Sequence, residues 1–215
     1  MNRNLPRRPL KYRKTGWAIF LADWFIRKSI NPNHISLAGI FFAVTVVLFL
    51  FLGSQPQAES GNRLCFYFLA ALNIQLRLLC NMLDGMVALE GQRQSRAGDL
   101  YNEIPDRIED VIILVGAGYS IAHIFFGSIL GWSAAIGAVL TAYLRVLGVA
   151  LGASAHFCGP MAKPQRMAVL TVACLLESTS LMKGYWLALA LIIIILGTLI
   201  TCIRRVALIR KELIS

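Results

Sequence analysis

The sequence predicts an all-α polytopic membrane protein with six transmembrane helices and an N-terminal interfacial amphipathic helix. Of its 215 residues, 57% are hydrophobic and only 15% are charged, whereas an average soluble domain has about 45–50% apolar and 25% charged residues. Several charge-poor stretches reach the roughly 20 residues needed to cross a bilayer. These observations argue strongly against a soluble globular protein.

Residues 1–30 are expected to form a basic segment that ends in a juxtamembrane amphipathic helix. Its apolar residues recur at helical spacing: Trp17, Phe20, Leu21, Trp24 and Phe25. Arg27 and Lys28 follow them and are available to anionic headgroups. The same pattern suits a helix packed on the bundle, and the sequence does not separate the two. A signal peptide is not predicted, because Asp23 and the two basic residues interrupt the apolar stretch.

Residues 31–215 are expected to form one six-helix membrane domain. The predicted spans are residues 34–58, 63–90, two helices within 111–144, 164–180 and 184–203. The charge-free run 111–144 is too long for one span, so the chain is expected to turn back near residues 123–128. The second span is unusual because it carries Arg77 and Asp84.

The basic residues predict the orientation, because Lys and Arg near span ends remain on the cytoplasmic side. The basic residues that give the net charge of +10 are concentrated before the first span, around residues 93–96 and 163–166, and in the tail after residue 203. Little besides Arg63 and Lys183 is left outside. We therefore interpret the charge as topology and expect no nucleic-acid partner. The expected location is a bacterial inner membrane, with the functional site facing the cytoplasm.

Seven of the 11 acidic residues fall between positions 84 and 110, near the predicted cytoplasmic boundary. An ionisable group at membrane depth costs about 2.5–3.5 kcal/mol, so this cluster predicts a functional site. One face of the second span carries Asn81, Asp84, Gly85 and Ala88, and one face of the third carries Asp99, Asn102, Glu103, Asp106 and Asp110. A solvated loop is the alternative, but it does not explain Asp84.

Oxygen ligands of this kind suit a hard cation such as Mg²⁺, Mn²⁺ or Ca²⁺, and not zinc. The five cysteines lack a CxxC motif and a histidine at ligand spacing, so neither a disulfide framework nor a zinc site is predicted. An ion transporter with carboxylates at the membrane midplane is disfavoured, because the acids gather at one membrane face.

The segment NMLDGMVAL at residues 81–89, followed after eight residues by Gly98, Asn102 and Asp106, resembles the CDP-alcohol phosphotransferase signature DxxDGxxAR, eight residues, GxxxDxxxD. The start of the first span, with Asn33 and Ser36, is similar to that family's entry motif. A motif with fixed gaps is far more specific than a lone glycine pattern. The resemblance implies a six-span fold and a Mg²⁺ or Mn²⁺ cofactor.

Three motif positions depart from the family pattern: its first and third aspartates are Asn81 and Asn102 here, and its arginine is Leu89. An asparagine oxygen can still bind a hard cation but brings no charge. Glu103 is expected to restore one charge. Three readings stay open, namely a retuned two-metal site, a one-metal enzyme, and an inactive relative that binds lipid or nucleotide. We favour a working variant, because the oxygen ligands and their spacing are kept.

By this resemblance, the chain transfers a phosphatidyl group from a CDP-alcohol such as CDP-diacylglycerol to a hydroxyl acceptor and releases CMP. The resemblance implies these roles: Asp106 as the base; Asn81, Asp84, Asn102, Glu103 and Asp106 as metal ligands; Asn33, Ser36, Gly85 and Ala88 for the donor nucleotide; Arg145, Lys163 and Arg166 for a phosphorylated polyol acceptor. Positive-inside topology is an alternative explanation of Lys163 and Arg166.

Two further features leave alternatives open. Gly148 and Gly152 form a GxxxG pattern, which suits either packing within the chain or the homodimer that the family resemblance implies. Pro105, one residue before the expected base, either kinks the third span or belongs to its first turn.

Overall fold

The computed structural model describes residues 15–56, 59–91, 96–124, 126–179 and 183–214, with the side chains of residues 96–99, 101 and 102 left out. The described part of the chain is helical and contains no strand, which confirms the all-α prediction. Its helices are α1 (Gly16–Arg27), α2 (Pro32–Ser54), α3 (Ser60–Glu90), α4 (Arg96–Ser120), α5 (Gly127–Ala150), α6 (Lys163–Glu177) and α7 (Tyr185–Ile214).

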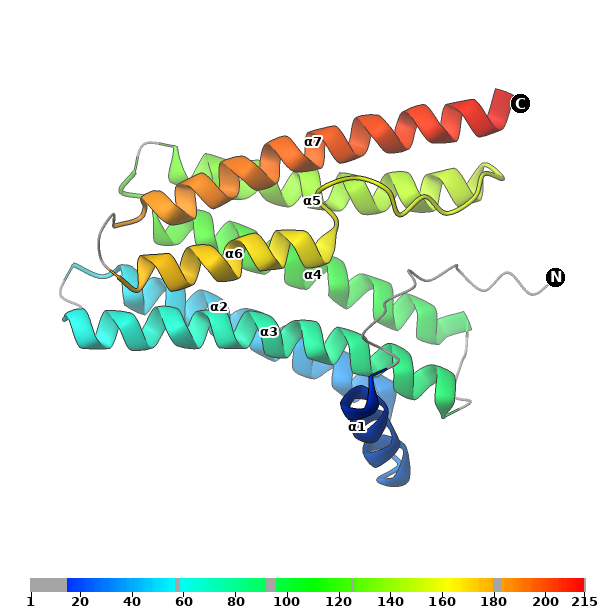
Figure 1. Ribbon diagram of the computed structural model, residues 1–215, viewed down its shortest axis with the longest axis horizontal. Coiled ribbons are helices and arrows are strands. Elements are labelled where there is room, and N and C mark those ends of the chain that lie inside the picture. The colour runs from blue at the N-terminus through cyan, green and yellow to red at the C-terminus, as the bar shows by residue number, and fades with distance from the viewer. Residues whose placement is uncertain (1–14, 57–58, 92–95, 125, 180–182, 215) are drawn as a thin grey trace.

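Helices α2 to α7 form a ring in which each helix packs against two neighbours, in the order α2, α3, α6, α7, α5, α4 and back to α2 (Figure 1). Inside the ring lies an apolar core that includes Tyr67, Ile74, Leu114, Leu170 and Leu191. Helices α3 and α4 are not adjacent in the ring, and the contact between them is much smaller than that between adjacent helices. The space between them is where charged side chains meet.

Four of these helices, α2, α3, α5 and α7, are long and apolar enough to cross a membrane. Helix α6 has 15 residues, so at 1.5 Å per residue it reaches only about 22 Å. Helix α4 is long enough but carries five acidic residues between positions 99 and 110. The chain is therefore an integral membrane protein with at least four candidate spans in its described part, and the count of six stays a prediction.

The expected turn within residues 111–144 is present, because α4 ends at Ser120 and α5 begins at Gly127. Pro105 lies well inside α4, which begins at Arg96, and so is not a first-turn proline. Helix α7 continues beyond the expected end of the last span, to Ile214. The ends of α3, α5 and α7 and the starts of α2 and α4 lie at one end of the bundle (Figure 1). The orientation of this end relative to a membrane stays a prediction.

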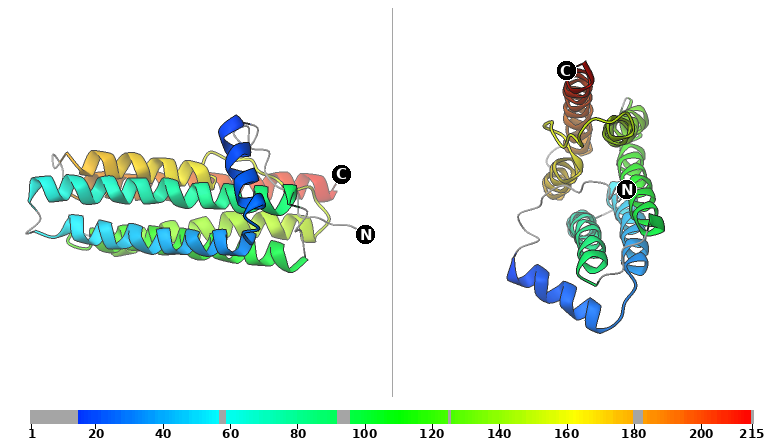
Figure 2. Two further views of the ribbon diagram at one scale, coloured as in Figure 1. Left: turned by 90° about the horizontal axis from the view of Figure 1, so that it is seen from below. Right: turned by 90° about the vertical axis from the view of Figure 1, so that its right-hand side faces the viewer.

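Helix α1 crosses the bundle at a steep angle and packs against α3 (Figure 2). Its buried face is made of Ala18 and Ala22, which contact an apolar cluster that includes Met82 and Met86. Trp17, Phe20 and Trp24 are exposed on the other side. The helix thus packs on the bundle through Ala18 and Ala22, with Phe25 partly buried against the same cluster. Its place at a membrane interface stays a prediction.

The loop between α5 and α6 is pinned to α7, and it leads directly to Lys163. Glu212 accepts hydrogen bonds from the Ser154 N–H at 2.7 Å and from His156 Nε2 at 2.8 Å. Nε of Arg205 donates to the carbonyl of Cys158 at 3.2 Å. These contacts fix the approach of the chain to the start of α6.

Of the two glycines in the GxxxG pattern, Gly148 makes a close contact within the chain. Gly148 is buried against Ile209 of α7, where an added Cβ would clash with the Ile209 side chain. Gly152 lies beyond the end of α5 with a φ of 99°, a backbone conformation that favours glycine. The homodimer therefore stays a prediction without support from these two glycines.

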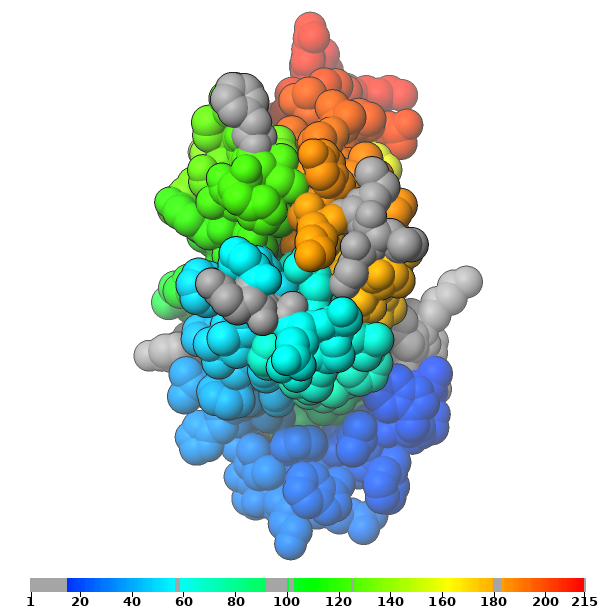
Figure 3. Space-filling model, turned by 90° about the vertical axis from the view of Figure 1, so that its left-hand side faces the viewer, coloured from blue at the N-terminus to red at the C-terminus, as the bar shows by residue number. Residues whose placement is uncertain are grey.

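Figure 3 shows the opposite end of the bundle, where α3 and α7 begin. The buried Glu177 holds the start of α7. Its carboxylate accepts the N–H groups of Gly184 at 2.9 Å and Trp186 at 3.0 Å, and it lies 3.7 Å from Nη2 of Arg63. We expect Glu177→Gln to lower the free energy of unfolding by about 1–3 kcal/mol, because an amide leaves part of this set unsatisfied. Thermal unfolding in detergent measures the loss, and an unchanged melting temperature would contradict the role of Glu177.

Candidate active site

The centre of the site is a buried network between α3, α4 and α6. Arg77 is 0% exposed; its Nε donates to Glu109 at 2.5 Å and its Nη2 to Asp110 at 2.7 Å. The other oxygen of Asp110 accepts from Nη2 of Arg166 at 2.6 Å. The unusual arginine of the second predicted span thus pairs with acids of the third. Two arginines and two carboxylates compensate one another in the interior.

Asp106, the expected base, lies one turn before this network and pairs with Lys163 of α6. Oδ1 of Asp106 accepts the hydrogen bond from Lys163, whereas Oδ2 lies 3.6 Å from Nη2 of Arg107. The side chains of Asp106 and Lys163 are 17% and 16% exposed, so both are partly open to solvent. The expected base and an expected acceptor-binding residue are therefore in direct contact.

Glu103, expected as a metal ligand, points to arginines. Nη2 of Arg145 lies 2.7 and 2.9 Å from its two oxygens, and Nη2 of Arg107 lies 3.0 Å from Oε2. The Arg145 guanidinium also lies over the ring of Phe157, 5.6 Å from its centroid. In this arrangement Glu103 neutralises Arg145.

The three expected acceptor-binding residues therefore converge on one face of α4. Arg145 meets Glu103, Lys163 meets Asp106 and Arg166 meets Asp110. The three acids stand at positions i, i+3 and i+7, which share a helical face. Two further helices, α5 and α6, supply the cations.

The other motif residues lie on α2 and α3. Helix α2 begins with Pro32 in its first turn, and the side chain of Asn31 caps it by accepting the Asn33 N–H at 3.0 Å. This start positions Ser36, whose hydroxyl donates to Oδ2 of Asp84 at 2.7 Å. Asn33 is exposed. The entry motif thus contacts Asp84, the first of the two motif aspartates that this chain retains.

Asp84 is 2% exposed, and its Oδ1 has no hydrogen-bond partner among the described residues. Gly85 beside it is buried, and Ala88 one turn on is half-buried. Asn81 donates through Nδ2 to Glu109 at 2.8 Å and to the Arg77 carbonyl at 3.1 Å. The side chain of Asn102 lies outside the described residues.

A hard cation fits this donor set in part. The orphaned oxygen of Asp84 and the less occupied oxygen of Asp106 are ligands of the type that Mg²⁺ and Mn²⁺ prefer. Within the described residues, however, no three acidic, histidine or cysteine side chains group closely enough to hold a metal. Glu103 is turned away to Arg145.

Three residues of the network have no role in the family motif: Arg77, Glu109 and Asp110. The available signal was the pair of adjacent acids at the start of a charge-free run together with an arginine at membrane depth, because such charges need partners.

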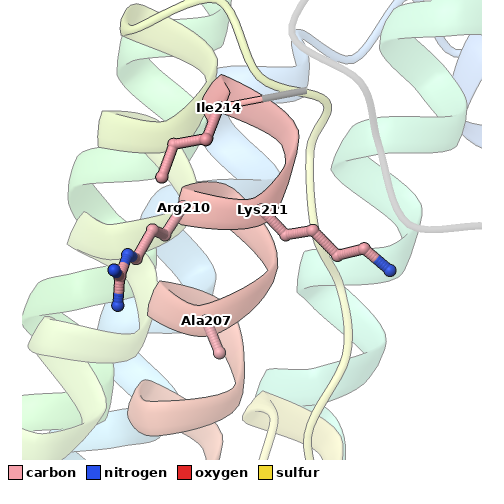
Figure 4. Close-up of a pocket in the computed structure, with 4 residues that line it drawn as sticks. All are labelled: Ala207, Arg210, Lys211 and Ile214. Carbon is pink, nitrogen blue, oxygen red and sulfur yellow. The ribbon is translucent and has the colours of Figure 1, made fainter.

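A pocket near the end of α7 is lined by Ala207, Arg210, Lys211 and Ile214 (Figure 4). All four come from one helix and none belongs to the network.

Comparison with known proteins gives a family match that covers most of the chain. A family model described as CDP-alcohol phosphatidyltransferase matches residues 29–203. The inner membrane protein YnbA of Escherichia coli K12 is 31% identical over 90 residues, which are 42% of this chain and 41% of that protein. The matched part thus spans less than half of this relative.

Among solved structures, the fold is similar to phosphatidylinositol phosphate synthase PgsA1 of Mycobacterium tuberculosis. The structure of PgsA1 with CDP-DAG bound has a TM-score of 0.72 at 20% identity, covering 89% of this chain and 92% of that one. The structure of PgsA1 with manganese and citrate has the same score and identity and covers 89% and 88%. At this identity the likeness shows a shared fold.

Proposed function

Because the chain belongs to the CDP-alcohol phosphatidyltransferase family, we propose that it transfers a phosphatidyl group from a CDP-alcohol such as CDP-diacylglycerol to a hydroxyl acceptor. The acceptor is a phosphorylated polyol and the other product is CMP. The observation that carries this proposal is the contact between Asp106 and Lys163, flanked by Arg145 and Arg166 on the same face of α4.

In the proposed reaction, Asp106 acts as general base. Its Oδ2 accepts the proton of the acceptor hydroxyl, while Lys163 holds Oδ1. The acceptor oxygen forms a bond to the phosphorus that carries the lipid, and the bond from that phosphorus to the bridging oxygen breaks. CMP leaves with the electron pair. Such phosphoryl transfer depends mainly on positioning and charge stabilisation.

The donor is proposed to lie along α2 and α3. Gly85 and Ala88 leave room for the cytidine beside α3, and Ser36 fixes Asp84 from α2. Asp84 and Asp106, with the amide oxygens of Asn81 and Asn102, would hold the cation. A bound Mg²⁺ or Mn²⁺ supplies neutralisation of the diphosphate charge. Glu103 is not included among these proposed ligands, because its carboxylate pairs with Arg145.

The proposal is tested by measuring CMP release from CDP-diacylglycerol by the purified protein, with sn-glycerol 3-phosphate or myo-inositol 1-phosphate as acceptor. We expect release that depends on Mg²⁺ or Mn²⁺ and stops on chelation. Failure to release CMP with both acceptors would contradict the proposal. CMP release that chelation leaves unchanged would contradict it as well.

Arg145→Gln and Lys163→Gln are expected to raise the KM for sn-glycerol 3-phosphate about 10- to 100-fold, since each charge-assisted hydrogen bond to a phosphate contributes about 1.5–3 kcal/mol. Glycerol provides the matched acceptor without a phosphate, and its KM is expected to change little. Equal effects on both acceptors would contradict phosphate binding by these residues.

An inactive relative that binds lipid or nucleotide is the second candidate, and it is motivated by Asn81, Asn102 and Leu89. Turnover that appears only in the double variant Asn81→Asp/Asn102→Asp would favour it.

We further propose that the site faces the cytoplasm of a bacterial inner membrane, that α1 lies at the membrane surface and that the protein works as a homodimer.

A further inference from the structure

We propose that Arg77 is a positioning residue of the transfer site, which links the base Asp106 to the acceptor-binding Arg166 and is itself held in place by Asn81 and Glu109. This inference rests on the proposed function and adds Arg77 and Glu109, which the family motif leaves without a role. It also gives a reason for the asparagine at position 81.

The contacts of Arg77 reach both functional side chains. Its Nη2 donates to the backbone carbonyl of Asp106 at 3.2 Å and to Oδ1 of Asp110 at 2.7 Å. Oδ2 of Asp110 accepts from Arg166 at 2.6 Å. One guanidinium on α3 thus fixes the turn of α4 that carries the base and, through one carboxylate, the arginine of α6.

The local structure of α4 explains why this turn needs an external contact. Pro105 precedes Asp106 and has no N–H, so α4 lacks one helical hydrogen bond next to the base. Helices α3 and α4 pack sparsely against each other, so apolar contacts between these two helices do little to hold the turn in place. A long, rigid guanidinium with several donors bridges such a gap better than any smaller side chain.

Asn81 and Glu109 set the orientation of Arg77. Oε2 of Glu109 accepts from both Nε of Arg77 at 2.5 Å and Nδ2 of Asn81 at 2.8 Å. An aspartate at position 81 would place a second carboxylate against Glu109 without a proton between them, and like charges at this distance repel strongly. Asparagine at 81 and glutamate at 109 therefore depend on each other.

Helix α2 also makes room for this carboxylate. Oε1 of Glu109 lies in the space that Gly39 leaves, where an added Cβ would overlap it. Glu109 is 1% exposed and is thus enclosed by residues of α2 and α3. The negative charge that the family motif places at position 81 is found here on the facing helix, at Glu109.

The first test compares Arg77→Met and Arg77→Lys with Arg63→Met. Arg63 is the matched control, because it is a buried arginine on the same helix that pairs with Glu177 near the other end of the bundle. The readouts are the melting temperature, the kcat of CMP release from CDP-diacylglycerol and the KM for sn-glycerol 3-phosphate. Arg77→Lys keeps the charge, so it remains informative if Arg77→Met does not fold.

Both methionine variants are expected to lower the melting temperature. Only the Arg77 variants are expected to lower kcat and raise KM, by about 10- to 100-fold, the usual effect of removing a residue that orients a reacting group. Kinetic constants that change equally in the Arg63 and Arg77 variants, or in neither, would overturn the inference.

The second test exchanges the charge between positions 81 and 109. In metal-free buffer, Asn81→Asp is expected to lower the melting temperature by roughly 6–12 °C. The double variant Asn81→Asp/Glu109→Gln is expected to recover most of this loss. Its new carboxylate at position 81 lies one helical turn from Arg77, and its new amide at position 109 can donate a hydrogen bond to that carboxylate. The double variant is also expected to recover CMP release.

An Asn81→Asp variant that keeps its stability, or a double variant no better than Asn81→Asp, would overturn the inference. If the wild-type protein released no CMP while the melting temperatures followed the expected pattern, the proposed function would fail and the role of Asn81 and Glu109 in holding Arg77 would stand.

Discussion

The Asp106→Asn variant is expected to release CMP about 10²- to 10⁴-fold more slowly than the wild-type protein, because an amide cannot accept the acceptor proton. Its amide oxygen can still accept the hydrogen bond from Lys163, so the variant is expected to fold. The measurement is the kcat of CMP release from CDP-diacylglycerol at saturating acceptor, together with the melting temperature.

Asp23→Asn is the matched control, because Asp23 is an exposed aspartate of α1 outside the site. It is expected to retain wild-type kcat. An Asp106→Asn variant that is folded and equally active would exclude Asp106 as the base.

The Asp110→Asn variant is expected to lose about 3–5 kcal/mol of stability, because it leaves two buried guanidiniums without their shared carboxylate. Asp110 lies between Arg77 and Arg166, both almost fully buried. Denaturant or thermal unfolding of the detergent-solubilised protein measures the loss.

Glu90→Gln serves as the comparison for Asp110→Asn, since Glu90 is exposed at the end of α3. Exposed substitutions of this kind usually change stability by less than about 0.5 kcal/mol. Equal unfolding curves for Asp110→Asn and the wild-type protein would show that the network does not stabilise the bundle.

Much of the fold could be predicted from the sequence, because apolar runs and their interruptions reflect helix positions directly. The turn after Ser120 follows from the excessive length of one charge-free run. The crossing of α1 and its packing through Ala18 and Ala22 could not be predicted, since the aromatic residues at helical spacing suit either a membrane surface or a protein contact.

The sequence predicted which residues belong to the site better than it predicted which of them contact one another. The motif identified Asp84 and Asp106, and Ser36 indeed contacts Asp84. Spacing along one helix does not determine which partner a long side chain selects on another. Glu103 therefore contacts Arg145 where metal ligation was expected, and that role is not supported by its position.

The substitution of asparagine at position 81 illustrates the same limit. From the sequence it is a lost charge, whereas in the structure its amide contacts the carboxylate of Glu109. The partner is 28 residues away on a facing helix, and no local pattern connects the two. Only the arrangement of α3 and α4 around Arg77 makes the relation visible.

Synthesis of a phospholipid from a CDP-alcohol by this chain can be detected by mass spectrometry of the product. Lipids would be extracted from cells that express the wild-type protein or the Asp106→Asn variant at matched levels. We predict a phospholipid whose head group is a phosphorylated polyol in the wild-type extract, absent from the variant extract. Identical lipid profiles in the two extracts would show that the chain does not make such a phospholipid.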